Sequence, residues 1–239
     1  MRIKNYLLGY KNMYIMQDTD MFNFSLDSVL LPNFVTINKS VQNILDIGCG
    51  NGPIPLILST KTDAHITGVE IQKEVYDLAQ ESVKINDLEN RIDIINADIN
   101  ELYKELETES FDVITCNPPY FKISENSNKN ESEYKTIARH EVKLNLEDII
   151  KISRKLLKNN GVLGIVHRPE RLIDIIELMR KYNIEPKKIR LVYPKKDKDA
   201  NILLIEGTKN GKPGIKIQPP LYSHEEDGSY TLEVQEFFS

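Results

Sequence analysis

Short apolar segments alternate with amphipathic segments along most of this chain. Seven apolar segments have the length and β-branched character of strands, and the longer segments between them repeat apolar residues at helical spacing. Strands that alternate with helices run parallel, because each helix returns the chain to the same end of the sheet. We therefore predict an α/β fold with a seven-stranded, mostly parallel sheet and helices on both faces. The predicted strands are Asn43–Ile47, Ile66–Glu70, Ile92–Asn96, Phe111–Asn117, Val162–His167, Ile189–Tyr193 and Ile202–Glu206.

Residues that start and stop helices refine this outline. Asn145 is expected to cap a helix that ends at Lys158, and Pro169 is expected to open the next helix. The last two strands are separated only by the short loop Pro194–Ala200, so they are predicted to form an antiparallel hairpin at one sheet edge.

The overall composition is that of a soluble globular protein, with 40% hydrophobic and 28% charged residues among 239. No apolar run approaches the roughly eighteen residues needed to span a bilayer, and the N-terminus lacks the features of a signal peptide. Cys49 and Cys116 are far apart and show no metal-ligand spacing, so no metal site is expected. A reducing cytoplasm is the simplest location.

Charge is distributed unevenly along the chain, whose net charge is −5. The segment Lys151–Lys198 holds 14 Lys and Arg against 5 Asp and Glu, whereas the remainder holds 17 against 31. Such a basic segment can give an acidic protein a surface that faces phosphates. The alternative is that these side chains belong to ordinary solvated helix faces and loops, and charge alone leaves both open.

A glycine-rich turn follows the first strand, in the segment ILDIGCGNGP from Ile44 to Pro53. Its glycines allow positive φ angles and close approach of the backbone to a ligand. The third glycine of a dinucleotide-binding loop is missing, because Pro53 stands in its place. Asp46 adds a carboxylate beside the turn, which suits a cationic ligand better than a pyrophosphate.

Further acids follow the next two strands. Glu70 ends the second strand and could accept hydrogen bonds from ribose hydroxyls. Asp98 follows the third strand and could reach a purine amino group, while Ile99 packs on the ring. Each acid alone could be a helix cap or a solvated turn residue. Together, at successive strand ends on one sheet edge, they outline a nucleoside pocket.

The fourth strand ends in an unusual corner, Asn117-Pro118-Pro119-Tyr120, within the stretch FDVITCNPPYF. The two prolines stop the strand and remove two backbone donors, which leaves an amide and an aromatic ring at the strand end. An ordinary strand-ending turn would explain the prolines. It does not explain their combination with a glycine loop and two placed acids.

These motifs resemble those of the class I S-adenosylmethionine-dependent methyltransferases, which have a Rossmann-like fold. The resemblance rests on four motifs at the ends of the first four predicted strands. These are the segment DIGCGNG, the acid Glu70, the tripeptide Asn96-Ala97-Asp98 and the segment NPPY. NPPY is similar to the corner of enzymes that methylate an exocyclic NH2. The segments FSLDSVLL, NGPIPLIL, ARHE and KPGIKIQPPL look most like the bacterial tRNA1(Val) (adenine-37-N6)-methyltransferase family.

The resemblance implies a cofactor and a role for each site residue. S-adenosylmethionine would be held by residues from all four strand ends. Asn117 and Pro118 would offer carbonyl oxygens to the target amine, and Tyr120 would stack on the flipped base. Substrate contacts are expected for Tyr120, Phe121, Arg139 and His140. The implied cofactor-binding residues are Asp46, Gly48, Gly50, Glu70, Ile71, Asp98, Ile99 and Asn117.

The chain is predicted to have three parts, and the resemblance implies tRNA as the partner, without a membrane or an obligatory protein partner. Residues 1–40 would form an extension that packs near the cofactor site. Residues 41–207 would form the methyltransferase core, with a mobile loop at 122–136, and residues 208–239 an irregular tail.

Three alternative functions stay open at this point. A glutamine N5-methyltransferase acting on release factors shares NPPY, although the first forty residues are too few for a separate docking domain. An NAD-dependent oxidoreductase would share the fold, but the missing glycine weighs against it. A nucleic-acid binder without catalysis is the third alternative.

Overall fold

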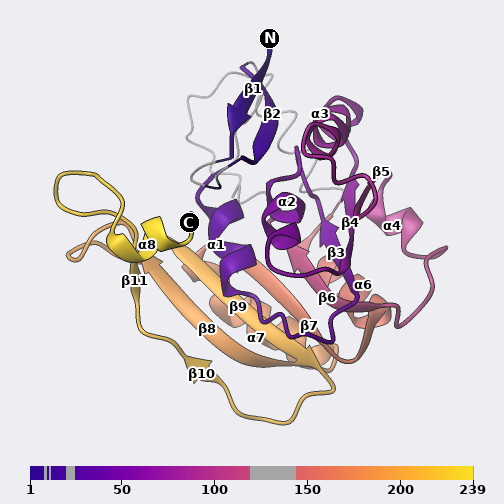
Figure 1. Cartoon of the computed structure of the whole chain (residues 1–239). Helices are drawn as coiled ribbons and strands as arrows, with labels where there is room; N and C mark the ends of the chain where they lie inside the picture. The colour runs from indigo at the N-terminus through magenta and orange to yellow at the C-terminus, as the bar shows by residue number, and fades with distance from the viewer. Residues whose placement is uncertain (8–9, 11, 20–24, 119–143, 239) are drawn as a thin grey trace, which may run out of the picture.

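The computed structural model describes residues 1–7, 10, 12–19, 25–118 and 144–238, and within these ranges it contains one large sheet and one small hairpin (Figure 1). The strands are β1 Arg2–Tyr6, β2 Tyr14–Asp18, β3 Asn43–Ile47, β4 His65–Glu70, β5 Ile92–Asn96, β6 Phe111–Cys116, β7 Leu157–His167, β8 Ile184–Tyr193, β9 Ile202–Lys209, β10 Lys216–Ile217 and β11 Leu221–Tyr222. The helices are α1 Asp27–Phe34, α2 Pro53–Ser59, α3 Lys73–Lys84, α4 Ile99–Leu102, α6 Leu146–Leu156, α7 Leu172–Lys181 and α8 Leu232–Glu236, with a 3-10 turn at Pro169–Arg171.

The large sheet has the order β10-β8-β9-β7-β6-β3-β4-β5, and β11 also pairs with β8. Strands β3 to β7 pair in parallel, whereas β9 is antiparallel to both β7 and β8. The predicted parallel sheet and the antiparallel hairpin are therefore confirmed. The described part of the sheet has nine strands, two more than predicted, because β10 and β11 add two residues each beside β8. Strands this short produce no recognisable periodicity in a sequence.

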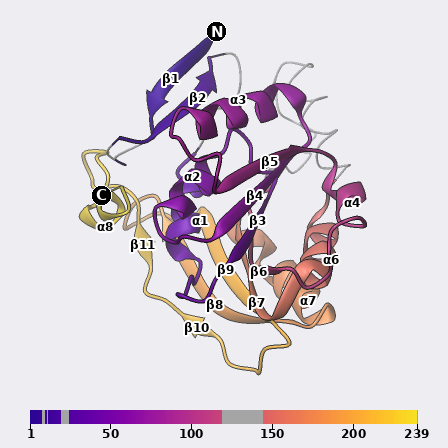
Figure 2. The same ribbon diagram turned by 45° about the vertical axis from the view of Figure 1, so that its right-hand side comes forward.

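Helices cover both faces of the sheet (Figure 2). One apolar cluster joins one sheet face to α1, α2 and α3, and a second joins the other face to α4, α6 and α7. None of the helices among the described residues is long and apolar enough to cross a lipid bilayer.

Helix α6 begins where the sequence predicts and ends two residues earlier than predicted. Asn145 caps this helix as predicted, since its side chain accepts a hydrogen bond from the Asp148 backbone at 3.0 Å. The predicted end at Lys158 is wrong, because α6 ends at Leu156 and β7 begins at Leu157. Leu157 pairs with Phe111 of β6, so strand pairing prevails over the local helical pattern.

The N-terminal hairpin packs on α3 and contacts the glycine turn. The Met16 backbone N–H donates to the Ser82 hydroxyl at 2.9 Å, and Asn51 donates to the Met16 carbonyl at 2.8 Å. At the other end of the chain, residues 208–239 contribute β10, β11 and α8 to the outer side of β8. This segment therefore contains regular elements that the sequence did not indicate.

Candidate functional site

The carboxyl ends of β3, β4, β5 and β6 lie together at one edge of the sheet. Ile47 is in register with Val69 of β4 and with Cys116 of β6, and Glu70 is in register with Asn96 of β5. The glycine turn, the acids and the Asn-Pro-Pro corner lie at or directly after these strand ends. Ligands of open α/β sheets bind at this edge, in the crevice where the strand order reverses.

The glycine turn takes the backbone conformations that its sequence requires. Gly48, Gly50 and Gly52 have φ angles of 69°, 57° and 93°, a region that side chains with a Cβ seldom adopt. The Gly48 N–H donates to the Val69 carbonyl at 2.9 Å, which fixes the turn to the end of β4. Pro53 then begins α2, where a proline is well tolerated.

Glu70 holds the turn from the neighbouring strand. Its carboxylate accepts hydrogen bonds from the Gly50 N–H at 3.1 Å and from the Gln72 N–H at 2.8 Å. Burial raises the pKa of Glu70 above its ordinary value, while these backbone hydrogen bonds oppose the rise. A carboxylate that already receives two donors retains lone pairs for a hydroxyl donor of a ligand.

Asp46 is fully buried next to the turn, with 0% exposure. One carboxylate oxygen accepts the Thr115 hydroxyl at 2.6 Å, and within the described part of the chain the other oxygen has no partner. Burial raises the pKa of Asp46 to about 7, and the negative charge of Glu70 adds to the rise. An unpartnered buried carboxylate beside a glycine turn fits a ligand that carries positive charge.

The end of β5 presents Asp98 and Ile99. One Asp98 carboxylate oxygen caps α4 by accepting the Asn100 N–H at 2.9 Å, so a structural role for this acid is present. Ile99 is 5% exposed. Ile71 lies nearby, because Asn96 donates to the Glu70 carbonyl at 2.9 Å and to the Ile71 carbonyl at 3.1 Å.

Asn117 and Pro118 directly follow β6. The strand ends at Cys116, one residue earlier than predicted, so Asn117 lies just beyond the hydrogen-bonded part of the sheet. Its side-chain NH2 donates to the Ser28 hydroxyl of α1 at 3.1 Å. Asn117 is half-buried and Pro118 is buried. The other predicted substrate residues, Tyr120, Phe121, Arg139 and His140, and the predicted mobile loop 122–136, lie outside the described residues.

A model of the methyltransferase small domain family matches residues 25–182, which is well over half of the chain. The chain belongs to this methyltransferase family. The match spans the glycine turn, the acids and the Asn-Pro-Pro corner.

Three curated relatives of this methyltransferase carry the name tRNA1(Val) (adenine(37)-N6)-methyltransferase. The protein from Flavobacterium psychrophilum is 31% identical over 78% of both chains. The protein from Parabacteroides distasonis is 29% identical over 96% of both chains, and that from Aliivibrio salmonicida is 30% identical over 85% of this chain and 84% of its own.

Solved structures share the fold. A predicted O-methyltransferase from Agrobacterium tumefaciens superimposes with a TM-score of 0.70 at 22% identity and covers 89% of this chain and 95% of its own. TYW2 from Pyrococcus horikoshii, solved with MeSAdo, superimposes with a TM-score of 0.61 at 11% identity. It covers 88% of this chain and 72% of its own. Identities this low establish the fold alone.

Three residues of this methyltransferase site escaped the sequence argument. Thr115 binds Asp46, Ser28 binds Asn117, and Asn96 connects the ends of β4 and β5. Ser28 lies in the segment FSLDSVLL, which carries part of the family resemblance, so that motif offered a signal. Thr115 and Asn96 had none, because each looks like an ordinary strand residue.

Proposed function

We propose that this methyltransferase transfers a methyl group from S-adenosylmethionine to N6 of adenine 37 in a valine tRNA. The observation that carries the proposal is the Asn117 amide at the end of β6, on the same sheet edge as the glycine turn. The shared name of the relatives supports the substrate. A tRNA substrate in turn favours a cytoplasmic location.

The residues around the glycine turn suit this cofactor. S-adenosylmethionine carries a positive sulfonium whose methyl group is electrophilic. A cationic sulfonium favours the ionised form of the buried Asp46 carboxyl, which then supplies negative charge beside the turn, and Glu70 retains lone pairs for ribose hydroxyls. Ile71 and Ile99 offer apolar surface for the adenine ring, and Asp98 an acceptor for its amino group. The positive φ angles of the turn permit close approach of the backbone.

Asn117 and Pro118 act on the target amine. The lone pair of an exocyclic amine is delocalised into the ring, which makes the nitrogen a poor nucleophile. Two carbonyl acceptors, one from each residue, draw the NH2 group toward a tetrahedral shape and localise the lone pair. The nitrogen then forms the new N–C bond, the sulfur keeps the bonding pair, and the amine loses one proton to solvent.

Holding the amine in line with the methyl group lowers the barrier further. Positioning of two reactants can contribute about 7–11 kcal/mol. A flipped adenine loses its stacking in the RNA, and Tyr120 and Phe121 are proposed to offset this cost by stacking on the base. Arg139 and His140 remain proposed contacts to phosphate or base.

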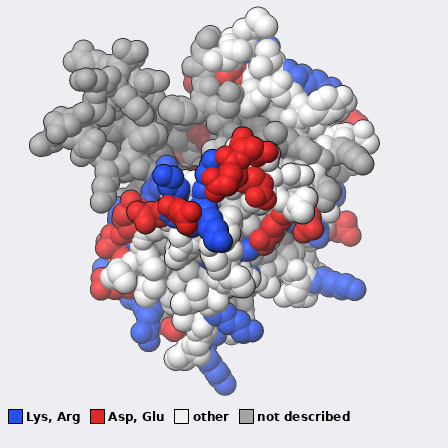
Figure 3. Space-filling view, turned by 90° about the vertical axis from the view of Figure 1, so that its left-hand side faces the viewer, with Lys and Arg blue, Asp and Glu red and all other residues white. Residues whose placement is uncertain are grey.

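The basic segment Lys151–Lys198 does not form a uniformly positive surface. Within the described chain, six of its cations form ion pairs with carboxylates, so each of the six has an acidic side chain beside it. On the face in Figure 3, basic and acidic side chains lie next to one another. The pairs are Lys158–Asp112, Arg171–Asp174, Arg180–Glu185, Lys181–Glu147, Lys188–Glu206 and Arg190–Glu233.

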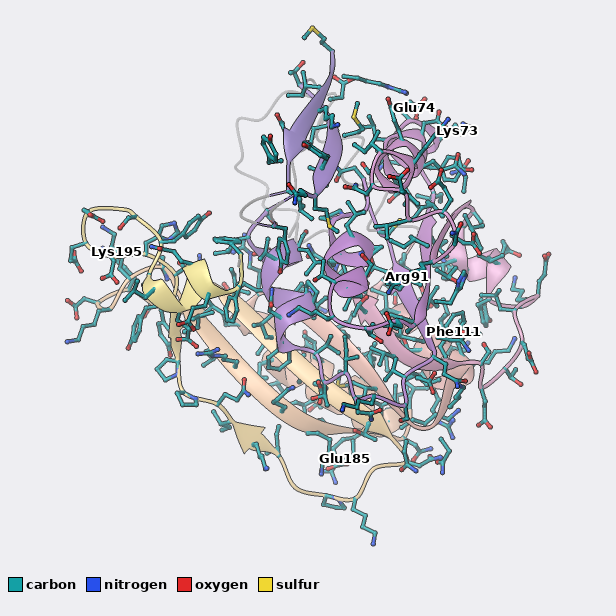
Figure 4. The ribbon with its side chains drawn as sticks, in the orientation of Figure 1. Lys73, Glu74, Arg91, Phe111, Glu185 and Lys195 are labelled. Atoms are coloured by element: carbon teal, nitrogen blue, oxygen red, sulfur yellow. The ribbon has the colours of Figure 1, made fainter. Side chains whose placement is uncertain are left out.

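The part of this segment that we propose for RNA contact is the loop at residues 194–200, in which three lysines outnumber the exposed Asp197 and Asp199. It follows β8 at the carboxyl edge, and Figure 4 shows Lys195 there, while Glu185 lies at the opposite end of β8. β8 is three strand positions from β6, or about 14 Å at about 4.8 Å per strand. The exposed Lys196 and Lys198, which we call the loop pair, are therefore proposed to contact phosphates near the target base.

The test is methyl transfer from labelled S-adenosylmethionine to three substrates in parallel. These are unmodified valine tRNA transcript, a release factor and duplex DNA, and the labelled nucleosides are identified by mass after digestion. Label in N6-methyladenosine at position 37 is the expected result. Label in the release factor would overturn the substrate but keep the corner chemistry. No label in any of them, despite measured cofactor binding, would overturn the proposal.

A further inference from the structure

Asn117 can serve the target amine only if its side-chain amide points the right way. The amide has an acceptor oxygen and a donor nitrogen, and rotation by 180° about the last side-chain bond exchanges them. The target amine is itself a hydrogen donor. With the amide inverted, the NH2 group of Asn117 would face the NH2 group of the target adenine. The site would then lose a hydrogen-bond acceptor where positive charge develops.

Among the described residues, the Ser28 hydroxyl lies against the nitrogen end of this amide. The Asn117 NH2 donates to the Ser28 hydroxyl oxygen at 3.1 Å, in a contact between residues 89 positions apart. Ser28 is the second residue of α1 and is 6% exposed, so bulk water does not compete freely for its oxygen.

The helix that carries Ser28 is held firmly against the sheet. Its residues Val29, Leu30 and Leu31 are at most 1% exposed and belong to the apolar cluster on that face. Close packing on β7 depends on Gly164, where a Cβ would lie 3.1 Å from a Val35 methyl carbon. A close-packed helix keeps its side chains in fixed positions. The Ser28 oxygen is therefore a fixed point beside the corner.

We propose that Ser28 is a positioning residue that selects the productive orientation of the Asn117 amide. By receiving the amide nitrogen, the Ser28 hydroxyl turns the Asn117 oxygen toward the amine of the substrate. The proposal rests on the methyl transfer proposed above and extends it to a residue of the FSLDSVLL segment. It also gives this segment a task in catalysis, in addition to its packing against the sheet.

The first test compares Ser28→Ala with Ser28→Thr. We expect Ser28→Ala to lower kcat about ten- to a hundredfold, because small errors of placement have large kinetic effects. Cofactor affinity and KM for the RNA are expected to stay within about twofold. Ser28→Thr keeps the hydroxyl and is expected to recover most of kcat. The matched control is Ser153→Ala, which removes a buried hydroxyl that donates to Ile149 on α6, away from Asn117.

A double-mutant cycle separates positioning from general damage. If Ser28 acts through Asn117, Ser28→Ala should have less than about a twofold effect on kcat in an Asn117→Ala background. An unchanged kcat in Ser28→Ala would overturn the proposal. So would a loss of the same size in both backgrounds, because Ser28 would then act independently of Asn117.

A spectroscopic test does not depend on the substrate. The side-chain NH2 signals of Asn117 in a ¹H–¹⁵N spectrum are assigned by their disappearance in Asn117→Ala. We expect these signals to move in Ser28→Ala and to stay near the wild-type position in Ser153→Ala. If the wild type methylates none of the three substrates, the proposed function fails, and the spectrum still decides the contact. Unmoved Asn117 signals in Ser28→Ala would overturn the positioning role.

Discussion

Replacing Asp46 by asparagine should change how the stability of the cofactor-free protein depends on pH. Burial raises the pKa of Asp46 from its ordinary value of 3.8 to about 7. Between these pH values the folded protein binds one more proton at this position than the unfolded chain does. The free energy of unfolding therefore falls as pH rises through this interval.

The size of the effect follows from the shifted pKa. A tenfold change in proton affinity corresponds to about 1.4 kcal/mol. Between pH 5 and pH 8, ionisation of Asp46 should therefore lower the free energy of unfolding of the wild type by about 3 kcal/mol. The asparagine introduced by Asp46→Asn does not ionise, and its oxygen can still accept the Thr115 hydroxyl, so the variant lacks this contribution.

The assay is urea unfolding of both proteins, without cofactor, at several pH values from 5 to 8. All other titrating groups are common to both proteins, so the difference between the two free energies of unfolding isolates Asp46. We expect Asp46→Asn to gain stability relative to the wild type as pH rises, by about 3 kcal/mol across the range. Parallel pH profiles for the two proteins would refute the argument that Asp46 is buried and unpaired in the free protein.

The remaining predictions concern the corner, the RNA surface and His167. Asn117→Ala should lower kcat by at least about a hundredfold with little change in cofactor affinity, measured by calorimetry and initial rates; near-normal turnover would contradict the mechanism. Glutamine at both positions of the loop pair should weaken tRNA binding and reduce the slope of the logarithm of the binding constant against the logarithm of the salt concentration by about 1.5. Glutamine at Lys187 and Lys212, near the opposite end of β8, should leave both quantities unchanged. Equal slopes for the loop-pair variant and the wild type would place the RNA on another surface. Burial lowers the pKa of His167 to about 4, so this residue should make the protein less stable as pH falls from 6.5 to 4. The free energy of unfolding of His167→Gln should lack this contribution. If it falls between pH 6.5 and pH 4 as steeply as that of the wild type, His167 does not contribute.

Much of the fold follows from patterns that extend over a few residues. The strands Asn43–Ile47 and Ile92–Asn96 have the predicted ends, because an apolar β-branched run bounded by turn residues has few other solutions. The cap at Asn145 is equally local. The end of α6 was misplaced because it is decided by Leu157 pairing with Phe111, which lies 46 positions earlier in the sequence.

The candidate site divides in the same way. The sequence indicated the glycine turn, the acids at strand ends and the Asn-Pro-Pro corner, since each motif is a property of one short segment. The cofactor and substrate roles of these residues stay predictions. The partners of the motifs were not accessible to sequence reasoning, because Thr115 lies 69 positions from Asp46 and Ser28 lies 89 positions from Asn117.

The sequence by itself determined which chemical groups this methyltransferase has and which of them end strands. Only the tertiary structure decided the environment of those groups. Asp46 has a raised pKa because it is buried among elements from other parts of the chain, and Lys188 loses its availability to a ligand because Glu206 lies 3.0 Å away. Burial and charge pairing depend on atoms that packing brings together, whereas local patterns depend on neighbours along the chain.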